Sequence, residues 1–185
     1  MQVIKRNGKK EGVKFDKITA RIERLSFSLD ALVDATAVAR KVIEGLYDGV
    51  PTTELDNLAA ELAASFATRH PDYALLASRI AVSNLHKNSA KSFSKTMRRL
   101  HEYRDPTTGK QKPMIADEVM RVIEEHADLL DSTIVHSRDF DFDFFGFKTL
   151  EKSYLLRVDG EVVERPQHMY LRVAIGIHLD DIDAV

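Results

Sequence analysis

The feature that most constrains the fold of this chain is a series of amphipathic stripes at helical spacing, each with its own start and stop signals. Apolar side chains three and four positions apart share one face of a helix, so each stripe can be buried against its neighbours. Asp16 and Asp34 are suitable N-caps for the first two stripes, and His70-Pro71 ends the third. The stripes predict four helices, over residues 17–28 and 35–48, from Thr52 or Thr53 to His70, and over residues 72–87.

A small β unit is predicted before these helices. Val3 and Ile4 come directly before Lys5-Arg6-Asn7-Gly8. Asn-Gly between short extended runs is a strong signal for a two-residue hairpin turn in which both residues have positive φ. Val13 and Phe15 alternate with other residues and predict a strand buried on one face. The first half of the chain is therefore predicted to be a small sheet on a four-helix core.

The second half is also predicted to be mainly helical, over residues 91–103, 116–130 and 166–177. Asp105–Gly109 predicts an exposed turn, and residues 139–147, which alternate acid and Phe, predict an aromatic-rich turn rather than a strand. Asp159-Gly160, between short extended runs, predicts a second hairpin. The fold class is therefore mainly α (α+β), with one domain over residues 1–90 and a second over residues 91–185.

Composition excludes several classes of protein. Cysteine is absent from the 185 residues, so disulfides, thiolate metal sites and thiol catalysis within this chain are excluded. The 27 Lys and Arg residues nearly balance 29 Asp and Glu residues, and the formal net charge of −2 attracts neither nucleic acid nor an acidic membrane. No stretch approaches the roughly 18 apolar residues of a membrane helix, and the N-terminus lacks the apolar segment of a signal peptide. We therefore expect a cytoplasmic protein without a membrane partner.

Common catalytic and metal-binding motifs are missing. The seven histidines form no His-x-x-His, His-x3-His or Glu-x-x-His pair, so we expect no metal site. The chain has no GxGxxG, Walker A or GxSxG segment, and we assign no catalytic residue. Asp139, Asp141 and Asp143 have the spacing of a calcium loop, but phenylalanines separate them and no Glu follows at the required position.

The first seventeen residues carry a basic cluster around the predicted hairpin. Ammonium groups, free N–H groups of a turn and the positive end of a helix dipole all favour an anion, so the cluster predicts a polyphosphate site. Two other interpretations stay open: a solvated charged face, and an arm that binds nucleic acid, although the rest of the chain supplies no second basic stripe. The cluster comprises Lys5, Arg6, Lys9, Lys10, Lys14 and Lys17.

Five segments take this interpretation further. They are MQVIKRNGKKEGVKFDKIT, GLYDGVPTTELDNLAAELAA, HPDYALLASRIAVSNLHK, FDFFGFKTLEKSYLL and ERPQHMYLRVAIGIH. Together they resemble the N-terminal region of the large subunit of class I ribonucleoside-diphosphate reductases of the eukaryotic type, over the whole of this chain. The resemblance implies that residues 1–90 are an ATP-cone, a four-helix bundle capped by a small sheet.

In that family the ATP-cone sets overall activity, because ATP keeps the enzyme active and dATP drives an inactive oligomer. The resemblance therefore implies that ATP and dATP, accompanied by Mg, are the ligands of this chain. The positions that match the nucleotide site of the family are Lys5, Arg6, Glu11, Gly12, Val13, Lys14, Phe15, Asp16, Lys17, Thr52, Asp56 and Lys87.

The resemblance assigns polar roles to several of these residues. Lys5 and Arg6 match a basic pair that meets the phosphates. Lys17 and Lys87 match further phosphate contacts. Glu11 matches the residue that accepts a hydrogen bond from the adenine amino group.

The other assignments concern the base and the sugar. Val13 and Phe15 match apolar contacts to adenine, and Thr52 and Asp56 match contacts to the ribose and phosphates. Separating ATP from dATP requires sensing one hydroxyl, for which a carboxylate is a suitable acceptor, because an unpaired buried polar group costs about 1–3 kcal/mol. Gly12 departs from the Arg that is common there in the eukaryotic proteins, which weakens any phosphate or packing role at that position.

The resemblance also implies an enzyme, a thioredoxin- or glutaredoxin-dependent reductase whose catalytic cysteines lie in an α/β barrel outside this chain. We therefore expect the chain alone to be inactive. The implied partners are further copies of the large subunit, as a dimer and a dATP-dependent higher oligomer, and a radical-generating small subunit, without nucleic acid. The alternatives are a free-standing adenine-nucleotide sensor that acts on another protein and a helical module that binds nucleic acid.

Overall fold

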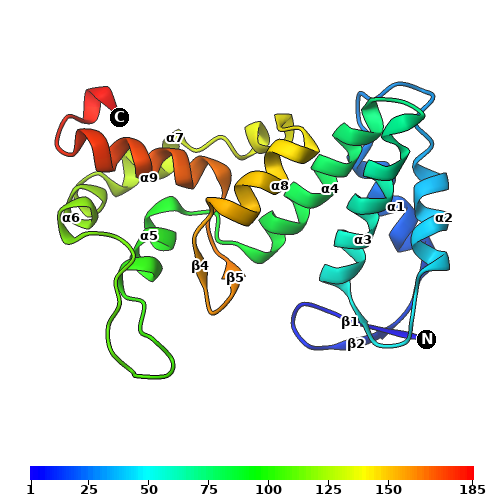
Figure 1. Cartoon of the computed structure of the whole chain (residues 1–185), viewed down its shortest axis with the longest axis horizontal. Helices are drawn as coiled ribbons and strands as arrows, with labels where there is room; N and C mark the ends of the chain where they lie inside the picture. Colours follow the sequence, from blue (N-terminus) through cyan, green and yellow to red (C-terminus); the bar gives the residue numbers. More distant parts are fainter. The chain divides into compact units, whose positions relative to one another are not determined.

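A computed structural model describes residues 1–185, and the chain in it divides into two compact units (Figure 1). The first unit comprises Met1–Asn84 and Phe140–Phe147, and the second comprises Leu85–Asp139 and Lys148–Val185. None of the helices is both long and apolar enough to cross a membrane.

The sheet of the first unit has three short strands: β1 (Gln2–Ile4), β2 (Lys10–Gly12) and β3 (Val50–Pro51). Their order is β2-β1-β3, with β2 antiparallel and β3 parallel to β1. The strand predicted around Val13 and Phe15 is wrong, because the returning strand ends at Gly12 and Phe15 already begins a helix. The alternation there marks the passage from strand to helix.

The turn between β1 and β2 is longer than the two-residue turn predicted from Asn7-Gly8. The Gly8 N–H donates to the Lys5 carbonyl and the Lys5 N–H donates to the Lys9 carbonyl, both at 2.8 Å. Gly8 has a φ of 78°, and Asn7 is not among the residues with positive φ. These features define a three-residue loop with Gly at the left-handed position. The Asn7 side chain supports it by accepting from the Lys9 N–H at 3.1 Å.

Four helices complete the first unit, as predicted, and α2 packs against both α1 and α3. Figure 1 shows α1, α2 and α3 side by side, with β1 and β2 at one end of them. The first helix begins earlier than predicted, since Lys14 is its N-cap and Asp16 lies within its first turn, where a carboxylate still favours the helix dipole. The helices are α1 (Phe15–Leu25), α2 (Ala35–Glu44), α3 (Thr52–Ser65) and α4 (Asp72–Asn88), and a 3₁₀ helix, η1 (Phe66–Thr68), follows α3.

The interior of these helices is apolar and closely packed. Residues that are at most 2% exposed include Ile22, Val38, Val42, Ala63, Leu76 and Ile80. They come from all four helices and occupy the faces that the spacing of apolar residues indicates. Each helix is therefore held by burial of one stripe against the others.

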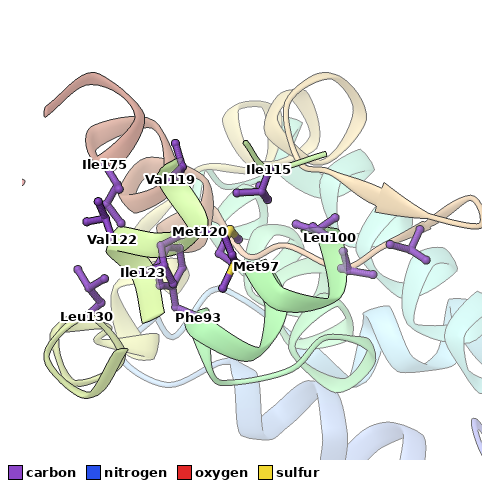
Figure 2. Packing of buried hydrophobic residues seen from close by; sticks show 12 residues of the cluster. Phe93, Met97, Leu100, Ile115, Val119, Met120, Val122, Ile123, Leu130 and Ile175 are labelled. Carbon is purple, nitrogen blue, oxygen red and sulfur yellow. The ribbon is translucent and has the colours of Figure 1, made fainter. Parts of the chain in front are cut away.

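The second unit is mainly helical, with one short hairpin. Its elements are α5 (Phe93–His101), α6 (Asp117–Glu125), α7 (Ala127–Thr133), η2 (His136–Asp141), α8 (Phe144–Ser153), β4 (Arg157–Val158), β5 (Glu161–Val162), α9 (Pro166–His178) and η3 (Ile182–Ala184). The elements η2 and α8 run across the unit boundary, as α4 does after Asn84. Figure 2 shows its core, in which side chains of α5, α6, α7 and α9 converge. Phe93, Met97, Leu100 and Ile123 are fully buried there.

Two predictions for this half need correction and one is confirmed. The helix predicted over 116–130 is two helices, because the backbone breaks at His126, whose φ is −117°. The aromatic-rich turn predicted over 139–147 is partly wrong, since a 3₁₀ helix leads into α8 from Phe144. The second hairpin is confirmed, because Asp159 and Gly160 have φ values of 52° and 84°, as a two-residue turn requires.

Candidate functional site

The candidate site lies at one edge of the three-stranded sheet. Parallel pairing places Ile4 of β1 opposite Pro51 of β3, so the residues that follow these strands leave the sheet at the same edge. Lys5 and Arg6 follow β1, and Thr52 is the first residue of α3. Pro51 is the N-cap of α3 and forms no side-chain cap. The free N–H groups and positive dipole end of α3 therefore lie beside two basic residues, an arrangement that favours an anion.

Glu11 links two other members of the basic cluster. Its Oε2 lies 3.5 Å from the Lys5 Nζ, and its Oε1 accepts a hydrogen bond from the Lys17 Nζ at 2.6 Å. The hydrogen bond from Lys17 and the charges of Lys17 and Lys5 lower the pKa of Glu11. Glu11 is therefore an ionised acceptor that holds two ammonium groups near the hairpin.

Asp56 is the centre of a second cluster and is only 6% exposed. Arg21 donates to it with two nitrogens, Nε to Oδ1 at 2.5 Å and Nη2 to Oδ2 at 3.0 Å. Arg6 donates to the same carboxylate with one nitrogen, Nη2 to Oδ2 at 2.8 Å. A nearly buried carboxylate is thus held between two guanidinium groups, and such charge-assisted bonds are stronger than neutral ones.

Asn84 extends this cluster to α4. Its Oδ1 accepts from the Arg6 Nη2, and its Nδ2 donates to the Thr53 carbonyl at 3.2 Å and to the Asn57 Oδ1 at 2.9 Å. Ser83 Oγ lies 3.4 Å from two nitrogens of Arg21. The hairpin and the helices α1, α3 and α4 therefore meet at one polar network in the first unit.

The residues between β2 and α1 occupy a single short connection. Gly12 ends β2, Lys14 is the N-cap of α1, and Asp16 lies in its first turn. Val13 is partly buried, whereas the Phe15 side chain is 50% exposed. An aromatic ring that is half exposed beside a basic cluster can offer an apolar face to a planar ligand.

The structure brings most of the predicted residues into the same unit. Lys5, Glu11 and Lys17 are in contact, as are Arg6 and Asp56. Lys87 lies in the last turn of α4, which belongs to the second unit, so its place relative to the others stays a prediction.

Sequence reasoning missed Arg21 and Asn84. A signal for Arg21 existed, because it follows Lys17 by four positions and therefore lies on the same face of α1. Asn84 gave a weaker signal, a polar residue among apolar ones in the fourth helix. Only the packing of α1, α3 and α4 shows that both residues contact the Asp56 cluster.

The first unit is thus a small sheet on four helices, a class of domain whose basic sheet edge beside a helix N-terminus is suited to an anionic ligand. In agreement, the ATP cone domain family matches residues 1–88, and the ribonucleotide reductase all-alpha domain family matches residues 140–185. The chain belongs to the family of ribonucleoside-diphosphate reductase large subunits and corresponds to their N-terminal region.

Relatives match almost the whole of this chain. The ribonucleoside-diphosphate reductase large subunit of Caenorhabditis elegans is 62% identical over 181 residues, which is 97% of this chain and 23% of the relative. The large chain of Schizosaccharomyces pombe is 58% identical over 185 residues, 100% of this chain and 23% of the relative. The large subunit of Arabidopsis thaliana is 56% identical over 186 residues, with coverages of 100% and 23%. The chain thus spans about a quarter of the length of these relatives.

Proposed function

We propose that this chain is the regulatory portion of a ribonucleoside-diphosphate reductase large subunit. In this proposal it binds ATP as an activator and dATP as an inhibitor, and so controls the supply of deoxyribonucleotides. The observation that carries the proposal is the sheet edge at which Lys5 and Arg6 lie beside the N-terminus of α3, with Arg6 paired to Asp56. The match of residues 1–88 to the ATP cone domain family supports it.

The residues present fit an adenine nucleotide. Lys5, Arg6 and Lys17 supply cations for the phosphates, with Lys87 as a further candidate, and a magnesium ion accompanying the phosphates is part of the proposal. The ionised Glu11 is suited to accept from the adenine amino group, and this requires Lys5 and Lys17 to share it or to turn to the phosphates.

The sugar end of the proposed site is polar and nearly buried. Asp56 is suited to accept from a ribose hydroxyl, and Thr52, one helical turn before it, offers a second polar group. A buried acceptor that loses its one hydroxyl partner costs about 1–3 kcal/mol of binding free energy. That range equals the usual coupling free energy between allosteric sites, so one hydroxyl is sufficient to separate activator from inhibitor.

Two alternatives are less well supported. A nucleic-acid arm is best served by basic side chains without acidic partners, whereas three of the six cluster residues are paired: Lys5 and Lys17 with Glu11, and Arg6 with Asp56. A free-standing sensor is disfavoured because reductase large subunits match 97% to 100% of the chain, including its second half.

The wider proposal concerns the complete reductase. We propose that catalysis depends on parts of the large subunit other than these 185 residues, which contain no cysteine. We further propose that the large subunit forms a dimer and, with dATP, a higher oligomer, and that it works with a radical-generating small subunit. A cytoplasmic location stays a prediction.

Thermal melting of the 185-residue chain tests nucleotide binding. Because a ligand that binds only the folded state stabilises it by RT ln(1 + [L]/Kd), Mg-ATP or Mg-dATP at a hundredfold excess over Kd adds about 2.7 kcal/mol. We expect a clear rise in Tm with both nucleotides. We expect a smaller one with Mg-GTP, which carries an acceptor where adenine has its amino group.

A matched pair of variants locates the effect. Arg6→Gln should reduce the nucleotide-dependent rise in Tm, whereas Lys9→Gln should not, because Lys9 is exposed on the same hairpin without an ion pair to Asp56. An unchanged Tm with both adenine nucleotides contradicts the proposed function.

A further inference from the structure

Resting on the proposed function, we infer that Arg21 is a positioning residue of the effector site. It holds the Asp56 carboxylate in the orientation that reads the sugar hydroxyl, while Arg6 exchanges from Asp56 to the nucleotide phosphates. The inference assigns different tasks to the two arginines that contact one carboxylate.

The geometry separates these two arginines. Arg21 contacts both oxygens of Asp56 through two different nitrogens, Nε and Nη2. A two-point contact between a planar guanidinium and a carboxylate fixes orientation as well as distance. Arg6 contacts Oδ2 through Nη2, the same nitrogen that donates to the Asn84 Oδ1. Loss of the Arg6 contact to Oδ2 therefore leaves the two-point contact of Arg21 in place, and this contact orients the carboxylate.

The positions of the arginines along the chain support the same division. Arg21 lies in the middle of α1, where its backbone is fixed by the helix, and Ser83 of α4 is within 3.4 Å of its guanidinium group. Arg6 lies in the hairpin loop, two residues after the end of β1 and beside the N-terminus of α3. Arg6 therefore has an anion-binding helix end close to its own backbone, and Arg21 is held within the helix bundle.

The exchange of Arg6 couples two recognition events. When Arg6 turns to the phosphates, Asp56 Oδ2 loses one donor and can accept from a ribose hydroxyl in its place. Throughout this step Arg21 keeps contact with both oxygens of a carboxylate that is only 6% exposed. A buried charge is stabilised by a cation held against it, so the retained Arg21 contact favours the exchange.

Isothermal titration calorimetry on the full 185-residue chain tests this inference. The measured quantities are the Kd values for Mg-ATP and Mg-dATP and the Kd for inorganic tripolyphosphate. Arg21→Gln should shrink the ATP-to-dATP discrimination by about fivefold or abolish it, with little change for tripolyphosphate. Arg6→Gln should weaken tripolyphosphate and both nucleotides by similar factors.

Three further variants serve as references. Asp56→Asn removes the carboxylate itself, and the ATP-to-dATP discrimination that remains is the reference value for the Arg21 variants. Arg21→Lys keeps the charge but cannot make the two-point contact, so it should recover only part of the discrimination. Arg24→Gln removes an exposed arginine from the same helix and should change nothing. If Arg21→Gln does not fold, the Lys variant decides in its place.

The outcomes distinguish the inference from the proposed function. If the unaltered chain binds neither nucleotide, the proposed function fails. If it discriminates between them and the Arg21 variants keep that discrimination, or weaken both nucleotides by the same factor, Arg21 has only a structural role and the inference is overturned. Discrimination that falls with Arg21 while tripolyphosphate binding stays constant supports it.

Discussion

His168 is an ionisable side chain in the interior of the second unit. It is fully buried on α9, its Nε2 lies 3.3 Å from the Lys91 carbonyl, and its Nδ1 has no hydrogen-bond partner. Burial, followed by the nearby charge of Arg165, lowers the pKa of His168 to about 4. At neutral pH it is therefore an uncharged part of the interior.

We predict that this histidine makes the second unit sensitive to acid. Its pKa in the folded state is lower than the ordinary value of 6.5, so the unfolded chain binds the proton first as the pH falls. Stability is thus present above pH 6.5 and is lost as the pH falls toward 4, by up to about 3 kcal/mol. Urea unfolding at several pH values measures this dependence.

A matched histidine serves as the control for this prediction. His168→Gln should show a shallower loss of unfolding free energy between pH 6.5 and 4, whereas His178→Gln, at an exposed position of the same helix, should follow the unaltered chain. Equal pH dependence in all three proteins would show that His168 does not control it. Asp139 and His136, whose charges also act on His168, stay in place in every variant.

At the scale of elements, the residues around each N-terminus determine where the predicted helices begin. Asp34 caps α2 by accepting from the Ala37 N–H at 3.0 Å, as its place before the stripe indicates. Asp16 is also an aspartate placed before a stripe of apolar residues, yet α1 begins at Phe15, one residue earlier. The difference arises because β2 ends at Gly12 and leaves only two residues before the first helical turn.

The cap of α2 leads to a stability prediction. Asp34→Ala should lower the free energy of unfolding by about 1 kcal/mol, because one N–H at the start of the helix loses its acceptor. Asp34→Asn should keep most of that stability, since an amide oxygen can accept the same hydrogen bond. Urea titrations of the three proteins measure the difference, and equal losses for Ala and Asn would contradict the role of the side-chain oxygen.

At the scale of the whole molecule, the two compact units differ from the two domains expected from the sequence, which meet at residue 90. The first compact unit includes Phe140–Phe147 as well as Met1–Asn84, and Phe147 is fully buried. The ATP cone domain family, by contrast, matches residues 1–88 alone. The expected domain boundary at residue 90 stays a prediction that a shorter chain can test.

We predict that residues 1–90 fold and bind adenine nucleotides but melt at a lower temperature than the full chain. The shorter chain keeps all twelve candidate site residues but loses the apolar segment Phe140–Phe147 of its own unit. Melting of both chains with and without Mg-ATP measures stability and binding together. A shorter chain with unchanged Tm would show that this segment does not stabilise the unit, and one that melts lower but gains nothing from Mg-ATP would show that binding needs residues beyond 90.

The sequence by itself determined the mainly helical class, the four helices of the first unit and the second hairpin. These features depend on local rules, such as apolar spacing, helix caps and the positive φ of Asp159-Gly160, which act over a few residues. The basic cluster and its resemblance to an ATP-cone were also visible in the order of residues.

Only the tertiary structure decided which charges meet. Arg6, Arg21 and Asp56 are 15 to 50 positions apart, and no local pattern joins them. They come together because β1 pairs with β3 and because α1 and α3 both pack against α2. The same packing leaves Asp56 only 6% exposed, so its hydrogen bonds to the two arginines are stronger than they would be in water. Contacts between distant segments depend on the whole core, and this is why sequence reasoning found Asp56 but not the arginine that holds it.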